Sequence, residues 1–246
     1  STLLQRWREM GTGWAPLLSE PVMAVALSHL EPAIRFGASV LDLGSGRGHV
    51  AAIFAERAAF VIGLDVDLDS VHHGSEKYED VFFVAGHAEQ LPLDDNSIDA
   101  VFCHSVLQYT KRAMSLAEIH RVLRPGGRFA IIENLRGNPF ARCYRMWRKH
   151  GSRSPYLRHQ TPLEHLDYGH IAELFQPFAS VQLQVFGVVS PVLAILPGLR
   201  KSAPLSATAR EQGFVRAVQK VDRELIRRSP ALASAAWNAV ICGSVD

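Results

Sequence analysis

The segment Val40–Gly48 reads VLDLGSGRG and combines residues that can bind a small ligand. Gly44, Gly46 and Gly48 lack side chains, so the backbone can turn tightly there and come close to a ligand. A helical pattern follows the turn, which would direct the amino terminus of that helix at the ligand. Dinucleotide enzymes space these glycines as G-x-G-x-x-G, whereas His49 occupies the position of the third glycine, and the spacing here is G-x-G-x-G.

A carboxylate supplies a second indication of a nucleoside site. Asp65 closes the next apolar run after the glycine-rich turn. A carboxylate at the end of that strand can accept hydrogen bonds from both hydroxyls of a ribose. The two features together predict a ligand that contains a ribose.

Short apolar runs alternate with helical patterns over the first two-thirds of the chain, which indicates a parallel α/β sheet. Runs of β-branched and aromatic residues of this length are typical of strands buried on both faces. The predicted strands are Ser39–Leu43, Phe60–Asp65, Val81–Ala85, Ile98–Cys103 and Arg128–Glu133. The predicted helices are Val50–Arg57, Asp69–Tyr78 and Met114–Leu123, with an earlier helix over Val22–Leu30 capped by Ser19.

The pattern changes after Glu133. Thr161–Glu164 reads as a helix N-cap followed by proline and a capping acid, which predicts a helix from there to about Phe175. The remaining predicted elements are a strand over Val181–Phe186, a long helix over Ala207–Arg228 and a last strand over Trp237–Val245.

The glycine-rich turn, with Asp42 just before it, resembles motif I of the class I S-adenosylmethionine (SAM)-dependent methyltransferases. The resemblance spans about residues 38–133, because three later segments are similar to this family in the same order. They are Phe83–Leu91 followed by Pro92, Ser97–Phe102 and Leu123–Phe129. The family implies a Rossmann-like α/β fold: a seven-stranded, mostly parallel sheet with helices on both faces and an antiparallel last strand.

The resemblance also implies one methyltransferase domain over residues 1–246. Its core would comprise about residues 37–134, 161–188 and 235–246. Inserted flaps would cover about residues 136–160 and 190–230.

The resemblance implies roles in binding SAM, whose product is S-adenosylhomocysteine. The glycine turn would contact the methionine part, Asp65 the ribose, and the segment after the third strand the adenine. His87 departs from the family, which usually has an acid there; its imidazole or Glu89 would then accept from the adenine amino group. The implied cofactor-binding residues are Asp42, Gly44, Ser45, Gly46, Gly48, Asp65, Val66, His87, Ala88, Glu89 and His104.

Methyl transfer from a sulfonium depends chiefly on positioning and desolvation, and a general base is needed only when the acceptor arrives protonated. The candidate catalytic residues are His159, Tyr109 and His104. His159 is favoured among them because it precedes the predicted helix cap and adjoins a basic segment. The alternative for each histidine is an ordinary place on a helix surface or in the interior. No metal-ligand spacing is present, since the adjacent His72 and His73 would point in different directions from a helix.

Charge is unevenly distributed, although the net charge is only +2. Arg136–His159 carries seven basic and no acidic residues, interleaved with aromatics, and Arg200–Arg228 carries eight basic and three acidic residues. Such segments suit an anionic partner or peripheral contact with a membrane. The alternative is a solvated amphipathic helix whose aromatics pack on the body.

Several protein classes do not fit the sequence. No apolar run reaches the roughly 20 residues of a membrane-spanning helix, and the amino terminus has no signal-peptide pattern. The three cysteines are too scattered for a disulfide framework, which favours a reducing, cytoplasmic setting.

The expected acceptor is a small, aromatic or lipid-like metabolite, methylated on oxygen, nitrogen or carbon in a biosynthetic reaction. The apolar segment Pro191–Leu199 would contribute to its pocket. An RNA methyltransferase that uses the basic flaps is an alternative, less favoured because the overall charge is nearly neutral. A SAM-binding partner protein without transferase activity is another. The sequence leaves monomer and homodimer open.

Overall fold

The computed structural model describes residues 2–11, 16–58, 60–143, 164–195 and 207–246. Seven strands form one sheet in the order β3-β2-β1-β4-β5-β7-β6. Strands β1 to β5 run parallel to one another, whereas β7 is antiparallel to both β5 and β6. The strands are β1 Ser39–Leu43, β2 Phe60–Asp65, β3 Phe82–Ala85, β4 Ile98–His104, β5 Leu123–Asn134, β6 Ala179–Phe186 and β7 Asn238–Ser244. The predicted fold class is confirmed.

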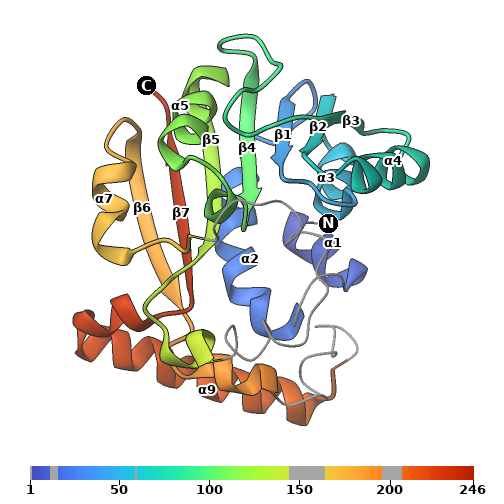
Figure 1. Ribbon diagram of the computed structural model, residues 1–246. Helices are drawn as coiled ribbons and strands as arrows, with labels where there is room; N and C mark the ends of the chain where they lie inside the picture. Colours follow the sequence, from blue (N-terminus) through green and yellow to red (C-terminus); the bar gives the residue numbers. More distant parts are fainter. Residues whose placement is uncertain (1, 12–15, 59, 144–163, 196–206) are drawn as a thin grey trace.

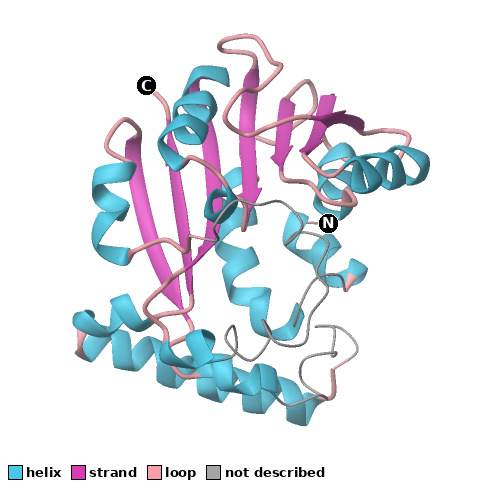
Figure 2. Ribbon diagram, viewed as in Figure 1, coloured by secondary structure: helices cyan, strands magenta, loops and turns pink. Residues whose placement is uncertain are grey.

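Helices cover both faces of the sheet (Figure 2). One apolar layer packs α5 and α7 against the sheet, and the other packs α1, α2 and α3 against its opposite face. Alternate residues of β1 serve the two layers: Leu41 and Leu43 belong to the first, and Val40 to the second. The α-helices are α1 Leu3–Met10, α2 Pro16–Leu30, α3 His49–Ala55, α4 Leu68–Lys77, α5 Arg112–Val122, α7 Ile171–Leu174 and α9 Ala209–Arg228. The 3-10 helices are η1 Leu107–Tyr109, η3 Tyr168–His170, η4 Ser190–Ile195 and η5 Pro230–Ala235.

Two sequence-based predictions about helices are wrong. Ser19 lies inside α2 instead of capping a later helix. The predicted helix up to Phe175 is replaced, in its described part, by η3 and the short α7, because Leu166 pairs with Leu135 as an isolated parallel bridge. That bridge gives the backbone before Asp167 its hydrogen bonds and keeps it extended. Thr161, Pro162 and Leu163 lie outside the described residues.

The carboxyl ends of the parallel strands share one edge of the sheet. In Figure 1 the β4 arrow points toward this edge, and α9 crosses the molecule beyond it. The turns after β1, β2, β4 and β5 therefore meet at this edge, which is where ligands bind in open α/β sheets. No helix within the described ranges has the length and apolar character needed to cross a membrane.

Candidate cofactor and acceptor site

The glycine-rich turn after β1 folds tightly against its neighbours. Gly44, Gly46 and Gly48 all have positive φ, at 72°, 52° and 79°. The amides of Gly44 and Ser45 both donate to the Leu64 carbonyl of β2, at 2.7 and 3.0 Å. A Cβ on Gly44 would lie 2.1 Å from Cγ2 of Val106, so this position has space only for glycine.

Asp65 ties the end of β2 to this turn. Its side chain is buried, Oδ2 accepts from the Gly46 amide at 2.7 Å, and Oδ1 accepts from the Asp67 amide at 2.9 Å. Each carboxylate oxygen has two acceptor sites, so both oxygens retain capacity for a ribose hydroxyl. The sequence indicated only the ribose role, and the anchoring of Gly46 follows from the fold. Val66, next in the chain, is 41% exposed and offers an apolar surface to a ring.

Asp42 and Ser45 carry polar atoms that the fold leaves unsatisfied. Asp42 Oδ2 and Ser45 Oγ are buried without a hydrogen-bond partner among the described residues. Burial, assisted by the neighbouring Asp65 charge, raises the pKa of Asp42 to about 7 against the opposing effect of a hydrogen bond from the Ala51 backbone. Buried polar groups normally have partners, so the unsatisfied atoms of this turn fit a site that takes up a polar ligand.

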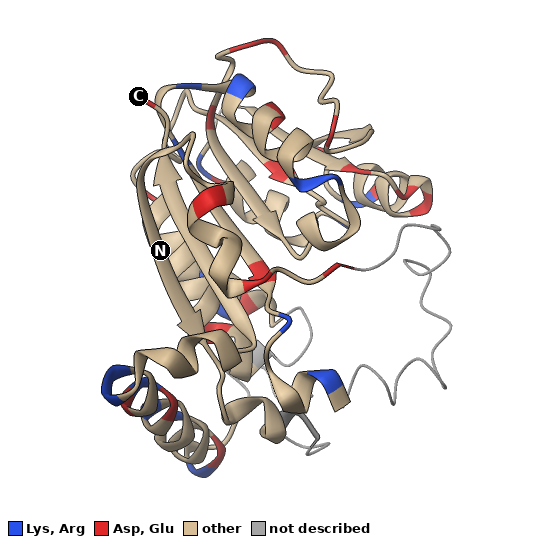
Figure 3. Ribbon diagram, turned by 60° about the vertical axis from the view of Figure 1, so that its left-hand side comes forward, with Lys and Arg blue, Asp and Glu red and all other residues tan. Residues whose placement is uncertain are grey.

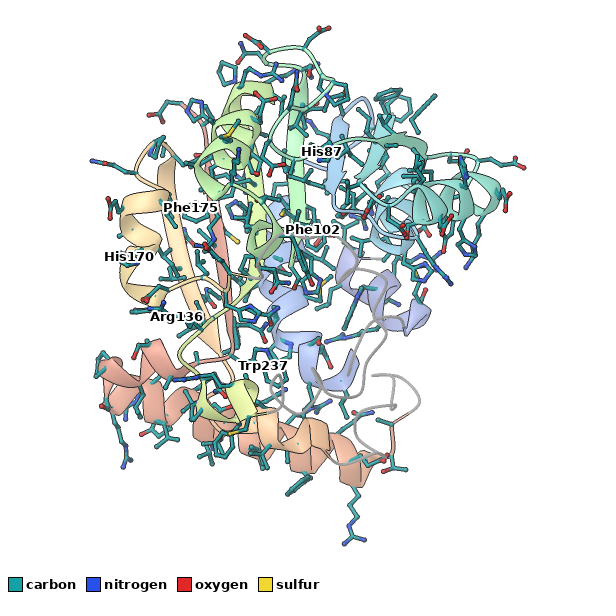
Figure 4. All side chains as sticks on the ribbon, in the orientation of Figure 1. His87, Phe102, Arg136, His170, Phe175 and Trp237 are labelled. Carbon is teal, nitrogen blue, oxygen red and sulfur yellow. The ribbon has the colours of Figure 1, made fainter. Side chains whose placement is uncertain are left out.

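The segment after β3 places one of its two candidate adenine-binding side chains in the open. His87 is exposed, and Ala88 is buried beside it. Glu89 is directed elsewhere, because its Oε1 accepts from the Lys111 amide at 3.0 Å, at the start of α5. His87 is therefore the side chain of this pair that is available to a ligand (Figure 4).

His104 ends β4 beside the glycine turn. The residue is exposed at the carboxyl edge of the sheet, and the protein atoms packed around its imidazole lower the pKa of His104 below the usual value. The imidazole is consequently neutral at pH 7. Ser105 follows with a φ of 61°, a left-handed conformation that is rare for a residue with a side chain. This turn brings Val106 into contact range of Gly44.

Glu133 holds the segment that carries Tyr109. Its carboxyl group is fully buried at the end of β5, and Oε1 accepts from the Leu107 amide of η1 at 2.7 Å. Desolvation raises the pKa of Glu133 to about 7. Tyr109 is the last residue of η1 and is partly buried. Glu133 thus links β5 to the turn after β4.

Asn134 is a further polar residue at this edge. Its Oδ1 accepts from Trp237 Nε1 at 2.9 Å and from Asn238 Nδ2 at 3.1 Å, and its Nδ2 donates to Ser105 Oγ at 3.3 Å. These bonds join β5 to the turn after β4 and to the start of β7. Sequence reasoning missed Asn134, although its place directly after Glu133 at a strand end was an available signal.

The other predicted catalytic residue cannot be placed beside these. His159 lies outside the described residues. Another histidine, His170, lines a groove of about 650 Å³ between α5 and η3–α7. Figure 4 shows it on the opposite side of β4 from His87. The described ranges hold no group of three or more His, Cys, Asp or Glu side chains suited to a metal ion.

Comparison with known proteins agrees with this geometry. Residues 41–131 match the family model described as a methyltransferase domain. An uncharacterized methyltransferase of Mycobacterium tuberculosis is 36% identical over 97 residues, covering 39% of this chain and 40% of the relative. A demethylmenaquinone methyltransferase of Beutenbergia cavernae is 39% identical over 100 residues, covering 40% of this chain and 42% of the relative.

Solved structures extend the likeness in fold over most of the chain. Geranyl diphosphate C-methyltransferase from Streptomyces coelicolor superposes with a TM-score of 0.59 at 16% identity, covering 93% of this chain and 81% of that one. Phosphoethanolamine N-methyltransferase 2 of Haemonchus contortus, bound to SAM, gives a TM-score of 0.55 at 20% identity, covering 86% and 50%.

The chain therefore contains a methyltransferase domain and has the fold of the class I SAM-dependent methyltransferases. SAM is the cofactor of this class. The matched part of the chain spans only about two-fifths of the length of the two curated relatives named above.

Proposed function

We propose that this protein transfers a methyl group from SAM to an oxygen, nitrogen or carbon atom of a small, aromatic or lipid-like metabolite. The observation that carries the proposal is the Asp65 carboxylate, which bonds the Gly46 amide and adjoins the exposed Val66. This arrangement offers a ribose acceptor and an apolar surface for a ring beside a turn that has unsatisfied polar atoms.

The residues around this carboxylate form the proposed SAM site. When bound, SAM supplies a methyl group on a positively charged sulfur. The glycine turn would offer its backbone to the methionine part, and the neutral His104 would not repel the sulfonium. The proposed set is Asp42, Gly44, Ser45, Gly46, Gly48, Asp65, Val66, His87, Ala88, Glu89 and His104, with Glu89 acting through its bond to the amide of Lys111.

The proposed catalytic contribution is positioning of the acceptor and exclusion of water. His104 is a weak base because its pKa is lowered, so it suits orientation of the acceptor better than removal of a proton. Tyr109 stands on η1, which Glu133 anchors, and is proposed to contact the acceptor. His159 remains the proposed base for acceptors that arrive protonated.

The proposed acceptor class rests on the relatives and on the polar residues at the carboxyl edge. The named relatives include methyltransferases of demethylmenaquinone, geranyl diphosphate and phosphoethanolamine. Here Asn134 and Gln108 lie next to the proposed SAM site and are linked to the same turn after β4. The segment Pro191–Leu199 was expected to contribute to the acceptor pocket. In its described part, Leu193 packs against Leu17 and Val215, so this side chain stabilises α9 and does not itself offer a surface to the acceptor.

Calorimetric titration tests the cofactor. SAM and S-adenosylhomocysteine are expected to bind and NAD is not. Asp65→Ala should weaken SAM binding about 30-fold, or roughly 2 kcal/mol, because both ribose hydroxyls lose a charged acceptor.

Asp69→Ala is the matched control, since this exposed carboxylate lies in the first turn of α4 and should leave SAM affinity unchanged. Asp65 also holds Gly46, so the thermal unfolding of each variant is measured in parallel. Binding of NAD alone would overturn the proposal. SAM binding without product over a broad panel of acceptors would support a non-catalytic protein instead.

A further inference from the structure

Helix α9 presents an exposed apolar row on its outer side. Phe214 and Val221 are 50% and 52% exposed, and Ala217 lies between them in the sequence. Steps of three and four residues place side chains on one face of a helix. Arg210 and Arg228, both exposed, continue this row at its two ends.

A second row on the same helix is basic. Its members follow one another at intervals of four, three and four residues, and all are exposed: Arg216, Lys220, Arg223 and Arg227. Figure 3 shows the Lys and Arg colour on the side of α9 that faces away from the sheet. The apolar and basic rows are neighbours, because Ala217 of the first and Lys220 of the second are three residues apart and therefore adjacent on the helix surface.

The acids of α9 offset only part of this charge. Glu211 closes a capping box with Thr208. Asp222 is buried and accepts from the backbone amides of Val189 and Ser190 at the start of η4. Glu224 is paired with two arginines, Arg227 and Arg228. The six basic side chains of α9 thus outnumber its three acidic ones, and the helix keeps a net positive charge.

The inner side of α9 holds the helix in a fixed orientation. Val215 is buried against Leu17 and Leu193, so the two rows cannot turn inward to bury the apolar one. Phe140 is 45% exposed and Arg142 is exposed, in a segment that Asn138 holds at the same end of the molecule by donating to the carbonyls of Val188 and Ala235, next to η4 and η5. Both views place this end beyond the carboxyl edge of the sheet.

We propose that the outer face of α9 docks on an anionic lipid surface. The apolar row, Phe214, Ala217 and Val221, enters the boundary between headgroups and acyl chains, and the basic row pairs with lipid phosphates. A nucleic acid would account for the basic row alone. It would leave the exposed Val221 unexplained, because an aliphatic side chain has no ring on which a base can stack.

Docking in this way faces the carboxyl edge of the sheet toward the bilayer. This consequence rests on the proposed function: a lipid-like acceptor would leave the membrane next to the proposed site. The docking itself involves neither SAM nor an acceptor. Its failure is therefore distinguishable from failure of the methyltransferase proposal.

Sedimentation with lipid vesicles tests the docking. The whole chain is mixed with vesicles of phosphatidylcholine containing phosphatidylglycerol, or of phosphatidylcholine alone. One variant removes the apolar row (Phe214→Gln with Val221→Gln), and another reverses part of the basic row (Arg216→Glu with Arg223→Glu). Glutamate at these positions faces Lys220 and Arg227 one turn later, so the helix is expected to stay folded.

The matched control is Arg35→Glu with Phe36→Gln. Arg35 and Phe36 are exposed, Phe36 at 95%, but they precede β1 and so lie at the amino edge of the sheet. The wild-type protein and this control should bind the anionic vesicles equally and the neutral ones weakly. Each α9 variant should bind the anionic vesicles at least about tenfold more weakly, since each basic residue near the surface contributes substantially to such binding.

Three results would overturn the docking proposal. The first is a wild-type protein that stays in the supernatant with anionic vesicles. The second is an equal loss of binding in the Arg35 and Phe36 control. The third is tight, salt-sensitive binding of an RNA oligonucleotide that the apolar variant leaves unchanged, together with no binding to vesicles. Circular dichroism of every variant verifies that the fold is retained.

Discussion

Gly44 is the residue at which the cofactor turn has the least space. Its Cα faces Val106, and an added Cβ would lie 2.1 Å from Cγ2 of that side chain. The contact joins the turn after β1 to the turn after β4, the two segments proposed to hold the methionine end of SAM. The two turns can approach each other this closely only because residue 44 has no Cβ.

Gly44→Ala should therefore destabilise the protein more than Gly37→Ala. Both glycines have positive φ, at 72° and 90°, so both substitutions incur the cost of a left-handed alanine, about 1 kcal/mol. Gly37 has no neighbour within 4 Å, whereas Gly44 meets Val106. The added collision should cost roughly 1–3 kcal/mol more. Urea unfolding measures the difference, and adding Val106→Ala to Gly44→Ala should recover part of it.

Equal losses of stability at the two glycines would contradict the contact between the two turns. SAM titration of the same proteins separates binding from folding. Gly37→Ala should bind SAM normally, because Gly37 precedes β1 at the other edge of the sheet.

At the scale of elements, α9 and η4 are joined by one buried carboxylate. Asp222 Oδ1 accepts from the Val189 amide at 2.6 Å, and Oδ2 accepts from the Ser190 amide at 3.2 Å. Its side chain is 3% exposed. These bonds satisfy the first free amides of η4 and fix its start against the middle of α9.

Asp222→Ala should lower the free energy of unfolding by about 2 kcal/mol, because the amides of Val189 and Ser190 lose a charged, buried acceptor. Amide hydrogen exchange should become faster at Val189 and Ser190 while the exchange of β4 and β5 is unchanged. Glu224→Ala, which removes an exposed carboxylate of the same helix, should change stability by less than about 0.5 kcal/mol. Unaltered exchange at Val189 and Ser190 would show that the two elements are not held in this way.

At the scale of the whole molecule, buried acids under the carboxyl edge couple stability to pH. The pKa of Asp42 is raised from 3.8 to about 7, so the folded protein binds a proton there that the unfolded chain releases in this range. The stability contributed by the neutral carboxyl group is present below pH 3.8 and is lost as the pH rises toward 7. Glu133, with a pKa raised to about 7, acts in the same direction.

Asp42→Asn should remove the Asp42 part of this dependence. As the pH rises from 5 to 7, the free energy of unfolding of the variant should increase relative to that of the wild type by on the order of 2 kcal/mol. Above pH 7 the difference should stay constant. His104, whose pKa is lowered, acts with the opposite sign but equally in both proteins, so its effect cancels in the comparison. Urea unfolding at three pH values measures it, and a constant difference would exclude a raised pKa at Asp42.

Local chemistry allowed the first half of the sheet to be predicted closely. The bounds of β1 and β2 match the apolar runs that end at the glycine turn and at Asp65, because those runs are bounded by residues that stop a strand. The helix predicted up to Phe175 failed for a different reason. The bridge between Leu166 and Leu135 is a tertiary contact, and it cannot be predicted from the local sequence pattern.

In the candidate site, too, features that depend on local sequence could be predicted and features that depend on tertiary contacts could not. Asp42 and Asp65 could be found from the sequence because each occupies a fixed place relative to a strand end. The bond of Glu89 to the Lys111 amide, and that of Asp65 to the Gly46 amide, could not, since each joins segments whose relative position depends on the folded sheet. Asn134 was missed because its role depends on Trp237, which the fold brings to it from far along the chain.

The position of β7 between β5 and β6 determines the order in which the sheet can assemble. Among the described strands, β6 pairs with β7 alone, and β7 is also the one that pairs with β5 on that side. Both strands precede β7 in the chain, so each stays open until residues 238–244 enter between them. Closing such a distant contact is slow, and open strand edges pair readily with other molecules. A chain that lacked β7 would therefore leave the backbone groups of β5 and β6 unpaired along these edges, and we expect it to self-associate.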